Sequence, residues 1–303
     1  MTNYIMKIAF DDIYVHPLPE GHRFPMEKYE LIPQQLLREG VIAPAQLFAP
    51  APLEEAIILL THDTAYWRKL QQQTLSEREQ RRIGFKQSAA LTQREITICR
   101  GTIDCALHAL QHGVALNVAG GTHHAYADRG EGFCLLNDFA IAANYLLQQK
   151  LAKRILIIDL DVHQGNGTAA LFAGNDRVFT FSMHGANNYP FHKETSDWDI
   201  PLKDGTDNST YLQLLENALP ALIDRARPDM VFYLSGVDIL ETDRFGKLKV
   251  TQAGCLQRDE MVFACLRKHD IPCTVAMGGG YSAGIRDIVN AHCNTFKAAA
   301  AIY

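Results

Sequence analysis

The chain has 303 residues, of which 47% are hydrophobic and 21% charged, a balance that is ordinary for globular proteins and excludes a disordered or fibrous class. Its formal net charge is −5 and its Lys and Arg residues are scattered, so we expect no direct binding to nucleic acid. The start of the chain has no signal-peptide pattern, and no apolar run approaches the roughly 18 residues of a membrane span, so we expect a cytoplasmic protein without membrane association.

Short apolar runs alternate with longer amphipathic stretches along the chain, a pattern typical of strands and helices that repeat in a parallel sheet. The runs predict strands over residues 7–10, 56–60, 114–119, 154–160, 178–183, 230–236 and 272–277. The stretches predict helices over residues 25–39, 64–73, 88–112, 138–150, 209–226, 252–268 and 284–300. Because most runs are continuously apolar, we expect central strands covered on both faces. The predicted fold class is therefore α/β, a three-layer αβα sandwich with a central, mostly parallel sheet.

The sequence shows no boundary between domains. Pro and Gly fall at turns, and no internal repeat or linker-like segment interrupts the alternation of strands and helices. We therefore expect residues 1–303 to form a single domain. Seven dispersed cysteines without a CxxC pair favour buried thiols in a reducing compartment over metal ligands or nucleophiles.

Polar or glycine-rich segments follow four of the predicted strands, at the point where each strand ends. These segments are GGTHH (120–124), DVHQGNG (161–167), VD (237–238) and GGGY (278–281). In an open parallel sheet, ligands bind in the crevice beyond the carboxyl ends of the strands. We therefore expect the four segments to converge on one crevice.

Asp161 and His163 form the first candidate metal site. They stand two residues apart at a strand end, and the period of two in a strand places both side chains on one face. With Asp238 as a third ligand, one coordination position stays open for water, as in a catalytic zinc site. Iron(II) or cobalt(II) fits the same mixed oxygen and nitrogen set. An Asp-x-His pair alone more often caps a helix or bonds to backbone, and Asp238 is what favours the metal interpretation.

The neighbouring segments offer acid–base groups. Beside a metal-activated water, the pair His123 and His124 would supply one base and one cation, although both could equally be ordinary loop histidines. Tyr281, behind three glycines, could direct its hydroxyl at a carbonyl oxygen that becomes an oxyanion, or could be a core tyrosine. Asp159 could orient a histidine, or could be a buried acid bonded to backbone amides.

Taken together, these segments resemble the histone deacetylase family of the arginase/deacetylase fold. The similar segments occur in the family's order and are GGTHHAYADRGEGFC (120–134), DLDVHQGNG (159–167), SGVDILETDRFGKL (235–248) and GGGY (278–281). The segment HPLPEGHRFP (16–25) resembles the family's N-terminal signature. The short loops, with DRGEGFC and DILETDRFGKL, resemble the class IV branch most closely. The resemblance implies a deacetylase domain across the chain and a hydrolase that acts on linear amides.

The resemblance also implies the metal sites. Asp161, His163 and Asp238 would be the ligands of a catalytic zinc ion, with iron(II) as the alternative. The backbone around Asp159, Asp161 and His163, together with Ser182, would form the monovalent-cation site of the family, usually occupied by potassium.

Further roles follow from the same resemblance. His124 would be the general base that later protonates the leaving amine, and His123 its electrostatic partner, held by Asp159. Tyr281 would polarise the amide carbonyl beside the metal. Where many family members have an aspartate that orients the general base, this chain has Asn166, which forms hydrogen bonds but carries no charge.

The substrate channel is the last feature that the resemblance implies. Phe133 and Phe191 would line a narrow channel for an acyl-lysine, with ordinary core aromatics as the alternative. Gly132 and Gly279 would contact the substrate there. The segment 189–191 (Tyr-Pro-Phe) departs from class I relatives, which carry paired phenylalanines, so the channel rim differs.

Several alternatives remain open at this stage. The acyl group could be acetyl or a longer fatty acyl chain, and the substrate an acyl-lysine peptide, an acetylpolyamine or another small acylated amine. An arginase-like two-metal ureohydrolase is less favoured, because glycines at 165 and 236 stand where that branch has additional aspartates. A non-catalytic binder of acyl-lysine conflicts with the full set of catalytic residue types. The sequence contains no signal for the oligomeric state.

Overall fold

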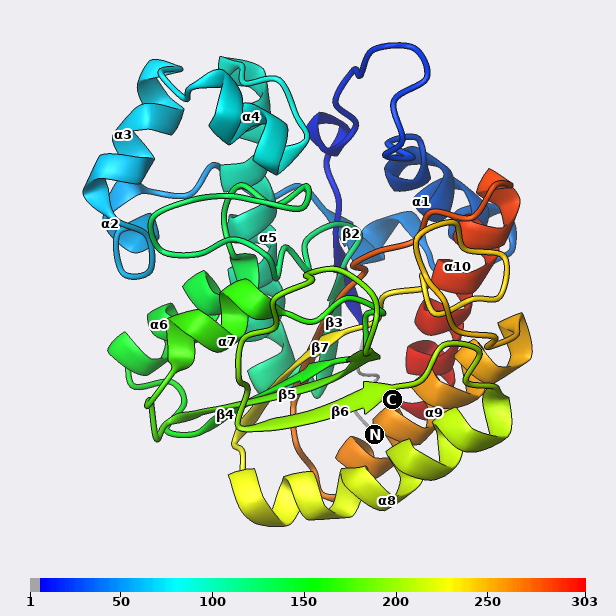
Figure 1. Ribbon diagram of the computed structural model, residues 1–303. Helices are drawn as coiled ribbons and strands as arrows, with labels where there is room; N and C mark the ends of the chain where they lie inside the picture. The colour runs from blue at the N-terminus through cyan, green and yellow to red at the C-terminus, as the bar shows by residue number, and fades with distance from the viewer. Residues whose placement is uncertain (1–5) are drawn as a thin grey trace.

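A computed structural model describes residues 6–303 as one eight-stranded sheet enclosed by helices (Figure 1). The strands are β1 (Lys7–Ala9), β2 (Leu47–Phe48), β3 (Val114–Asn117), β4 (Ile155–Asp159), β5 (Val178–Gly185), β6 (Trp198–Leu202), β7 (Met230–Leu234) and β8 (Cys273–Ala276). Their order across the sheet is β2-β1-β3-β8-β7-β4-β5-β6, and every neighbouring pair is parallel. This sheet confirms the predicted fold class.

Helices cover both faces of the sheet (Figure 1). One layer contains α5 (Ala89–His112), α6 (Asp138–Gln148) and α7 (Asn166–Phe172), and the other α1 (Lys28–Arg38), α8 (Asn208–Ala226), α9 (Gln252–Lys268) and α10 (Ile285–Ile302). The shorter helices α2 (Glu55–Ile58), α3 (Thr64–Gln72) and α4 (Glu77–Ile83) lie beyond these layers, on the α5 side. Within residues 6–303, no helix is both long and apolar enough to cross a membrane.

The local sequence explains where the main helices begin. The Asn137 side chain accepts a hydrogen bond from the amide of Ala140 and caps α6, and Thr251 caps α9 through the amide of Gly254. The long helix α5 ends at Gly113, whose φ of 92° few other residues adopt without strain. Asn137 and Thr251 thus mark where the loops after β3 and β7 end and the next helices begin.

The structure corrects one predicted strand and adds two. Residues 56–60 lie in α2 and the turn that follows it, because an apolar run of this length fits one face of a helix as well as a strand. The strands β2 and β6 were not predicted: both lie at sheet edges, where half-exposed residues replace a continuous apolar run. By contrast, the central strands β3, β4, β7 and β8 are buried at every residue.

A buried arginine on α9 holds the ends of two central strands in place. The guanidinium group of Arg258 donates hydrogen bonds to the backbone carbonyls of Leu160, Ser235 and Gly236, directly before two of the predicted metal ligands. Its charge is balanced by Asp259, with 2.8 Å between the closest nitrogen and oxygen, and both side chains are fully buried. Arg258 therefore fixes the backbone from which the candidate metal site projects.

Candidate active site and metal centre

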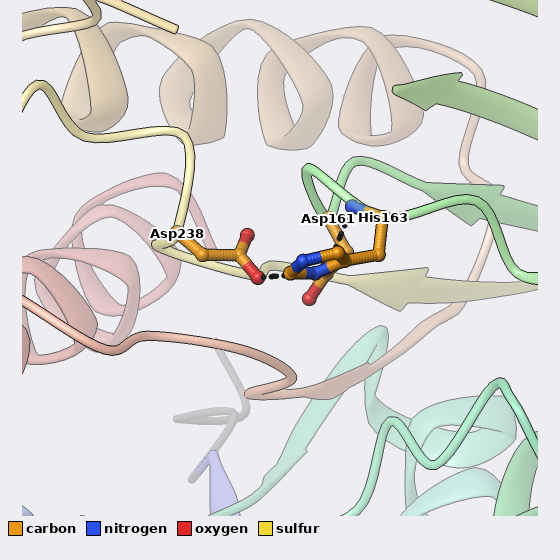
Figure 2. A group of neighbouring side chains, drawn as sticks. All are labelled: Asp161, His163 and Asp238. Atoms are coloured by element: carbon orange, nitrogen blue, oxygen red, sulfur yellow. Dashed lines mark hydrogen bonds and ion pairs between the residues drawn. The ribbon is translucent and has the colours of Figure 1, made fainter. Parts of the chain in front are cut away.

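The loops after β4 and β7 bring the three predicted metal ligands together. Atoms of Asp161, His163 and Asp238 that can bind a metal all lie within 4.8 Å of one another, and all three residues are buried. His163 Nδ1 is 3.0 Å from Asp161 Oδ1 and 3.1 Å from Asp238 Oδ2. Figure 2 shows Asp238 pointing from its own loop toward His163, while Asp161 and His163 come from the other loop.

Backbone amides orient both carboxylates of this cluster. The amide of Gly279 donates to Asp161 Oδ2 at 2.8 Å, and the amide of Val162 donates to Asp238 Oδ1 at 2.9 Å. The other oxygen of each carboxylate remains directed at His163. Such supporting hydrogen bonds hold ligands in a fixed orientation before a metal binds.

The charges of the cluster favour a cation between the carboxylates. Burial alone would lower the pKa of His163, but hydrogen bonds to Asp161 and Asp238 outweigh it and raise that pKa to about 10. Burial, together with the charge of Asp161, raises the pKa of Asp238 to about 7. The two buried carboxylates thus stabilise positive charge placed between them. Two carboxylate oxygens and an imidazole nitrogen form a donor set that fits zinc or iron(II).

The two adjacent histidines have different partners and opposite electrostatic environments. His123 Nδ1 is 2.7 Å from Asp159 Oδ2, and His124 Nδ1 is 2.6 Å from Asn166 Oδ1. Burial would lower the pKa of His123, but the carboxylates of Asp159 and Asp161 raise it. Burial and the nearby positive charges of His123 and His163 hold the pKa of His124 well below its usual value. Two imidazoles whose pKa values are shifted in opposite directions therefore lie side by side, with 4.1 Å between ring centroids.

Tyr281 lies across the metal cluster from the histidine pair. Its backbone amide donates to Asp243 at 2.6 Å, and its ring packs against Phe245 with 4.9 Å between ring centroids. Burial, followed by the negative charges of Asp161 and Asp238, raises the pKa of its phenol well above the usual value. The hydroxyl therefore keeps its proton and can donate a hydrogen bond.

Two cavities meet at these residues. A hollow with a volume of about 480 Å³ opens to the surface, and an inner cavity of about 40 Å³ lies behind it. The residues that line both are His124, Gly132, Phe133, His163 and Tyr281. His124, His163 and Tyr281 thus lie where the hollow adjoins the inner cavity.

The predicted channel residues lie at different depths. The Phe133 ring borders both cavities, whereas Phe191 stands at the mouth of the hollow with 85% of its surface exposed. Tyr189 lines the same hollow, and its ring meets that of His124 edge-on with 5.0 Å between centroids. Tyr189 is held by a 2.8 Å hydrogen bond from its hydroxyl to Glu131.

Gly132 and Gly279 are both required by close contacts. A Cβ atom at Gly279 would lie 2.0 Å from Asp238 Oδ2, and one at Gly132 would lie 2.6 Å from His124 Cδ2. There is also no space for a side chain at Gly165 and Gly236, the two positions at which arginase-like ureohydrolases would have additional aspartates. A Cβ atom would lie 2.3 Å from Asp159 Oδ2 at Gly165, and 2.4 Å from Asp161 Oδ2 at Gly236. Additional ligands for a second metal could not be placed there without moving the first set.

Glu131 is a functional candidate that the sequence interpretation missed. Asn166 Nδ2 donates to Glu131 Oε1 at 2.7 Å, and the Tyr189 hydroxyl donates to the same oxygen. The carboxylate therefore links the partner of His124 to the wall of the hollow. Its position between two glycines was visible in the sequence, but no spacing rule connects it to residues 35 and 58 positions away.

The inner cavity is also bordered by charges that the sequence interpretation missed. Its lining includes Arg94, which is buried and paired with Glu95. Behind the wall, the buried Lys28 donates to the carbonyl of Gly278 at 2.9 Å, and burial lowers its pKa to about 8. Neither cation lines the open hollow.

The predicted potassium site stays a prediction. Asp159 and Ser182 are paired in register on β4 and β5, so the structure brings these two residues side by side. The Ser182 hydroxyl lies 2.9 Å from His184 Nδ1.

The family model described as the histone deacetylase domain matches residues 22–296. The chain belongs to the histone deacetylase family. Histone deacetylase 2 of Arabidopsis thaliana is 30% identical over 89% of this chain and 72% of its own length. An uncharacterised protein of Picosynechococcus is 45% identical over 98% of this chain and 99% of its own, and the acetoin utilization protein AcuC of Staphylococcus aureus is 27% identical over 83% and 71%.

Solved structures agree with the fold. A deacetylase homologue of Aquifex aeolicus superposes with a TM-score of 0.84 at 23% identity, covering 98% of this chain and 84% of that one. A homologue crystallised with the ligand SAHA gives a TM-score of 0.85 at 23% identity, again covering 98% and 84%. Family membership makes the chain a deacetylase-type hydrolase that acts on amides, and assignment to class IV stays a prediction.

Proposed function

We propose that this protein is a metal-dependent deacylase that hydrolyses the amide of N-acetyl-lysine or of a similar short-chain acylated amine. The observation that carries the proposal is the meeting of a three-ligand metal cluster, a neutral His124 and a protonated Tyr281 where the hollow adjoins the inner cavity. Family membership supplies the reaction class, and these residues supply the chemistry.

Asp161, His163 and Asp238 would hold the metal ion, which we propose to be zinc, with iron(II) as the alternative. When bound, such an ion lowers the pKa of a water molecule and polarises the amide carbonyl. Gly165 and Gly236 support a single ion, because neither position has room for a further ligand.

His124 is proposed to act as the general base. Asn166 donates through Nδ2 to Tyr126 and Glu131, so its Oδ1 must accept the hydrogen bond from His124. His124 Nδ1 therefore carries the proton and Nε2 keeps a free lone pair. In this tautomer His124 takes a proton from the attacking water and later delivers it to the leaving amine.

Two further groups stabilise the charge that develops during the reaction. His123, whose protonated form Asp159 favours, stands beside His124. Its positive charge would stabilise the negative charge that develops on the attacked carbonyl. The Tyr281 hydroxyl would donate a hydrogen bond to that carbonyl oxygen as it becomes an oxyanion. Loss of one such donor typically costs about 10²–10³ in kcat.

The inner cavity supports a short acyl group. Because the amine belongs to the larger part of the substrate, which must remain in the hollow, the acyl group has to turn toward the inner cavity. A volume of about 40 Å³ holds roughly three water molecules, at about 10–15 Å³ for each. An acetyl group fits this space, whereas a fatty acyl chain requires the buried walls to move.

The test compares acetyl-lysine and myristoyl-lysine peptides of one sequence on the zinc-loaded protein, with His124→Ala and Tyr281→Phe as inactive controls. We expect acetate release from the first peptide and much slower turnover of the second. Absence of turnover on every acyl peptide would overturn the proposed function, and faster release of myristate would overturn the acyl-length proposal alone.

A further inference from the structure

The mouth of the hollow carries charges of one sign. Five basic side chains line it, and within the described residues its lining contains no Asp or Glu: Arg23, Arg81, Arg82, Arg244 and Lys247. The whole chain has 34 acidic and 29 basic residues, so this basic rim has the opposite sign to the net charge. An excess of positive charge in this hollow acts on every substrate that enters it.

Neutral partners hold most of the basic rim in position. The Arg23 guanidinium lies 5.5 Å from the centroid of the Phe245 ring. Arg244 Nε donates to the backbone carbonyl of Tyr281 at 3.1 Å, and Lys247 Nζ donates to that of Asn187 at 3.0 Å. These contacts orient the cations without neutralising their charge.

Carboxylates near the mouth do not compensate the basic rim. In the part of the chain that the structure describes, Arg81 is the one member of the rim paired with an acid, and its partner Glu77 is itself exposed. Asp243 lies beneath the rim but accepts hydrogen bonds from the backbone amides of Phe245, Gly246 and Tyr281. Within the described residues, the other four basic side chains of the rim have no ion-pair partner, so the rim presents an excess of positive charge to solvent.

We propose that the basic rim binds carboxylate groups that flank the acylated amine. This inference rests on the proposed function, since it concerns what else the substrate of that site carries. Opposite charge at the entrance speeds productive encounters, and like charge suppresses them. Acetylpolyamines and segments rich in Lys and Arg are thus disfavoured. Phe191, exposed at the same mouth, offers an apolar contact to the flanking group.

The primary experiment compares acetyl-lysine peptides of equal length whose flanking residues are acidic, neutral or basic. We expect kcat/KM to be about 10-fold higher for the acidic than for the basic peptide at low ionic strength. The difference should lie mainly in KM, because the rim contacts the flanks and not the reacting amide. It should shrink to about 2-fold in roughly 0.5 M salt, where screening shortens the reach of surface charges.

A second arm identifies the source of the anionic group. It compares 6-acetamidohexanoate with its neutral amide and with acetylputrescine, three small substrates that differ in charge beyond the acetylated amine. If the acidic peptide and 6-acetamidohexanoate are both the preferred substrates of their sets, the rim binds any anionic substrate. If only the acidic peptide is preferred, the rim binds acidic protein segments. No preference in either arm overturns the proposal.

Charge-reversal variants test the assigned residues. Arg82→Glu and Lys247→Glu should each lower kcat/KM for the acidic peptide about 3-fold or more and raise it for the basic one. Arg78→Glu and Lys249→Glu are the matched controls, because both residues are exposed and neither lines the hollow. Equal effects of rim and control variants would contradict the assignment.

Binding measurements separate this proposal from the proposed function. Fluorescence anisotropy of labelled acidic and basic acetyl-lysine peptides reports the rim preference even without turnover. Tighter binding of the acidic peptide without any acetate release would overturn the deacylase function and leave the rim intact. Normal acetate release with equal binding of both peptides would overturn the rim and leave the deacylase intact.

Discussion

Replacing Asn166 by aspartate would place a carboxylate against His124, and the structure gives both the direction and the size of the effect. Asn166 Oδ1 lies 2.6 Å from His124 Nδ1, so the new charge would stand about 4 Å from the centre of the imidazolium charge. At that separation, an effective dielectric constant of about 20 gives at most about 4 kcal/mol, and an opposite charge this close typically shifts a pKa by about 1–3 units.

Glu131 reduces the expected shift. It lies 2.7 Å from Asn166 Nδ2, so the carboxylate introduced at position 166 would face the Glu131 carboxylate. The two would titrate as a coupled pair, and a proton held between them would reduce the negative charge beside His124. We therefore expect Asn166→Asp to raise the pKa of His124 by about 1–2 units, equivalent to about 1.4–2.7 kcal/mol. In Asn166→Asp combined with Glu131→Gln the repulsion disappears, and the rise should be larger.

The assay is the pH dependence of kcat/KM, whose acid limb reports the pKa of the base in the free enzyme. Because only neutral His124 accepts a proton, a higher pKa moves the acid limb of the profile to higher pH. Asn175→Asp, which introduces the same charge in the loop after α7, should leave the limb unchanged. An acid limb that does not move in Asn166→Asp would refute this account of the base.

Three further outcomes follow from the geometry. Removing the buried Arg258 leaves Asp259 without its counter-charge; Arg258→Met should therefore lower the free energy of unfolding by about 3–5 kcal/mol in urea titrations. The control Arg267→Met changes an exposed arginine and should lower the free energy of unfolding by less than about 1 kcal/mol. An equally small effect of Arg258→Met would contradict the expectation. Gly279→Ala directs a Cβ atom at Asp238 and should abolish stoichiometric zinc binding. In the control Gly284→Ala, the new Cβ would lie 3.4 Å from Asp287 Oδ2, an ordinary contact, and zinc binding should survive. Retained zinc binding in both variants would contradict the packing argument. Metal binding at pH 8 should release about one proton per chain, because the pKa of about 10 keeps His163 protonated in the metal-free protein. Calorimetry in buffers of different ionisation enthalpy measures this, and binding without proton release would contradict it.

The sequence predicted the centre of the site because simple rules govern it. The spacing of two predicted that Asp161 and His163 lie together; the structure places both in the loop after β4, which ends at Asp159. The convergence of parallel strand ends brings Asp238 to them. The buried strands were recognisable from continuous apolar runs. The edge strand β6 was not, because a strand that is half exposed lacks such a run.

The surroundings of the site could not be predicted, because they depend on loops that meet only in the folded chain. Glu131 contacts Asn166 and Tyr189 from a different loop, and no local pattern marks such an encounter. In the segment 189–191, the loop conformation decides which aromatic ring faces His124, and it selects Tyr189 over Phe191. The basic rim is likewise assembled from three separate segments.

The central claim is that one metal ion, held by Asp161, His163 and Asp238, is required for amide hydrolysis. Titration of the metal-free protein with zinc, with acetate release from an acetyl-lysine peptide followed at each step, tests it most directly. Activity should rise in proportion to added zinc and level off at one equivalent per chain. Acetate release without metal, or a break at two equivalents, would contradict the account.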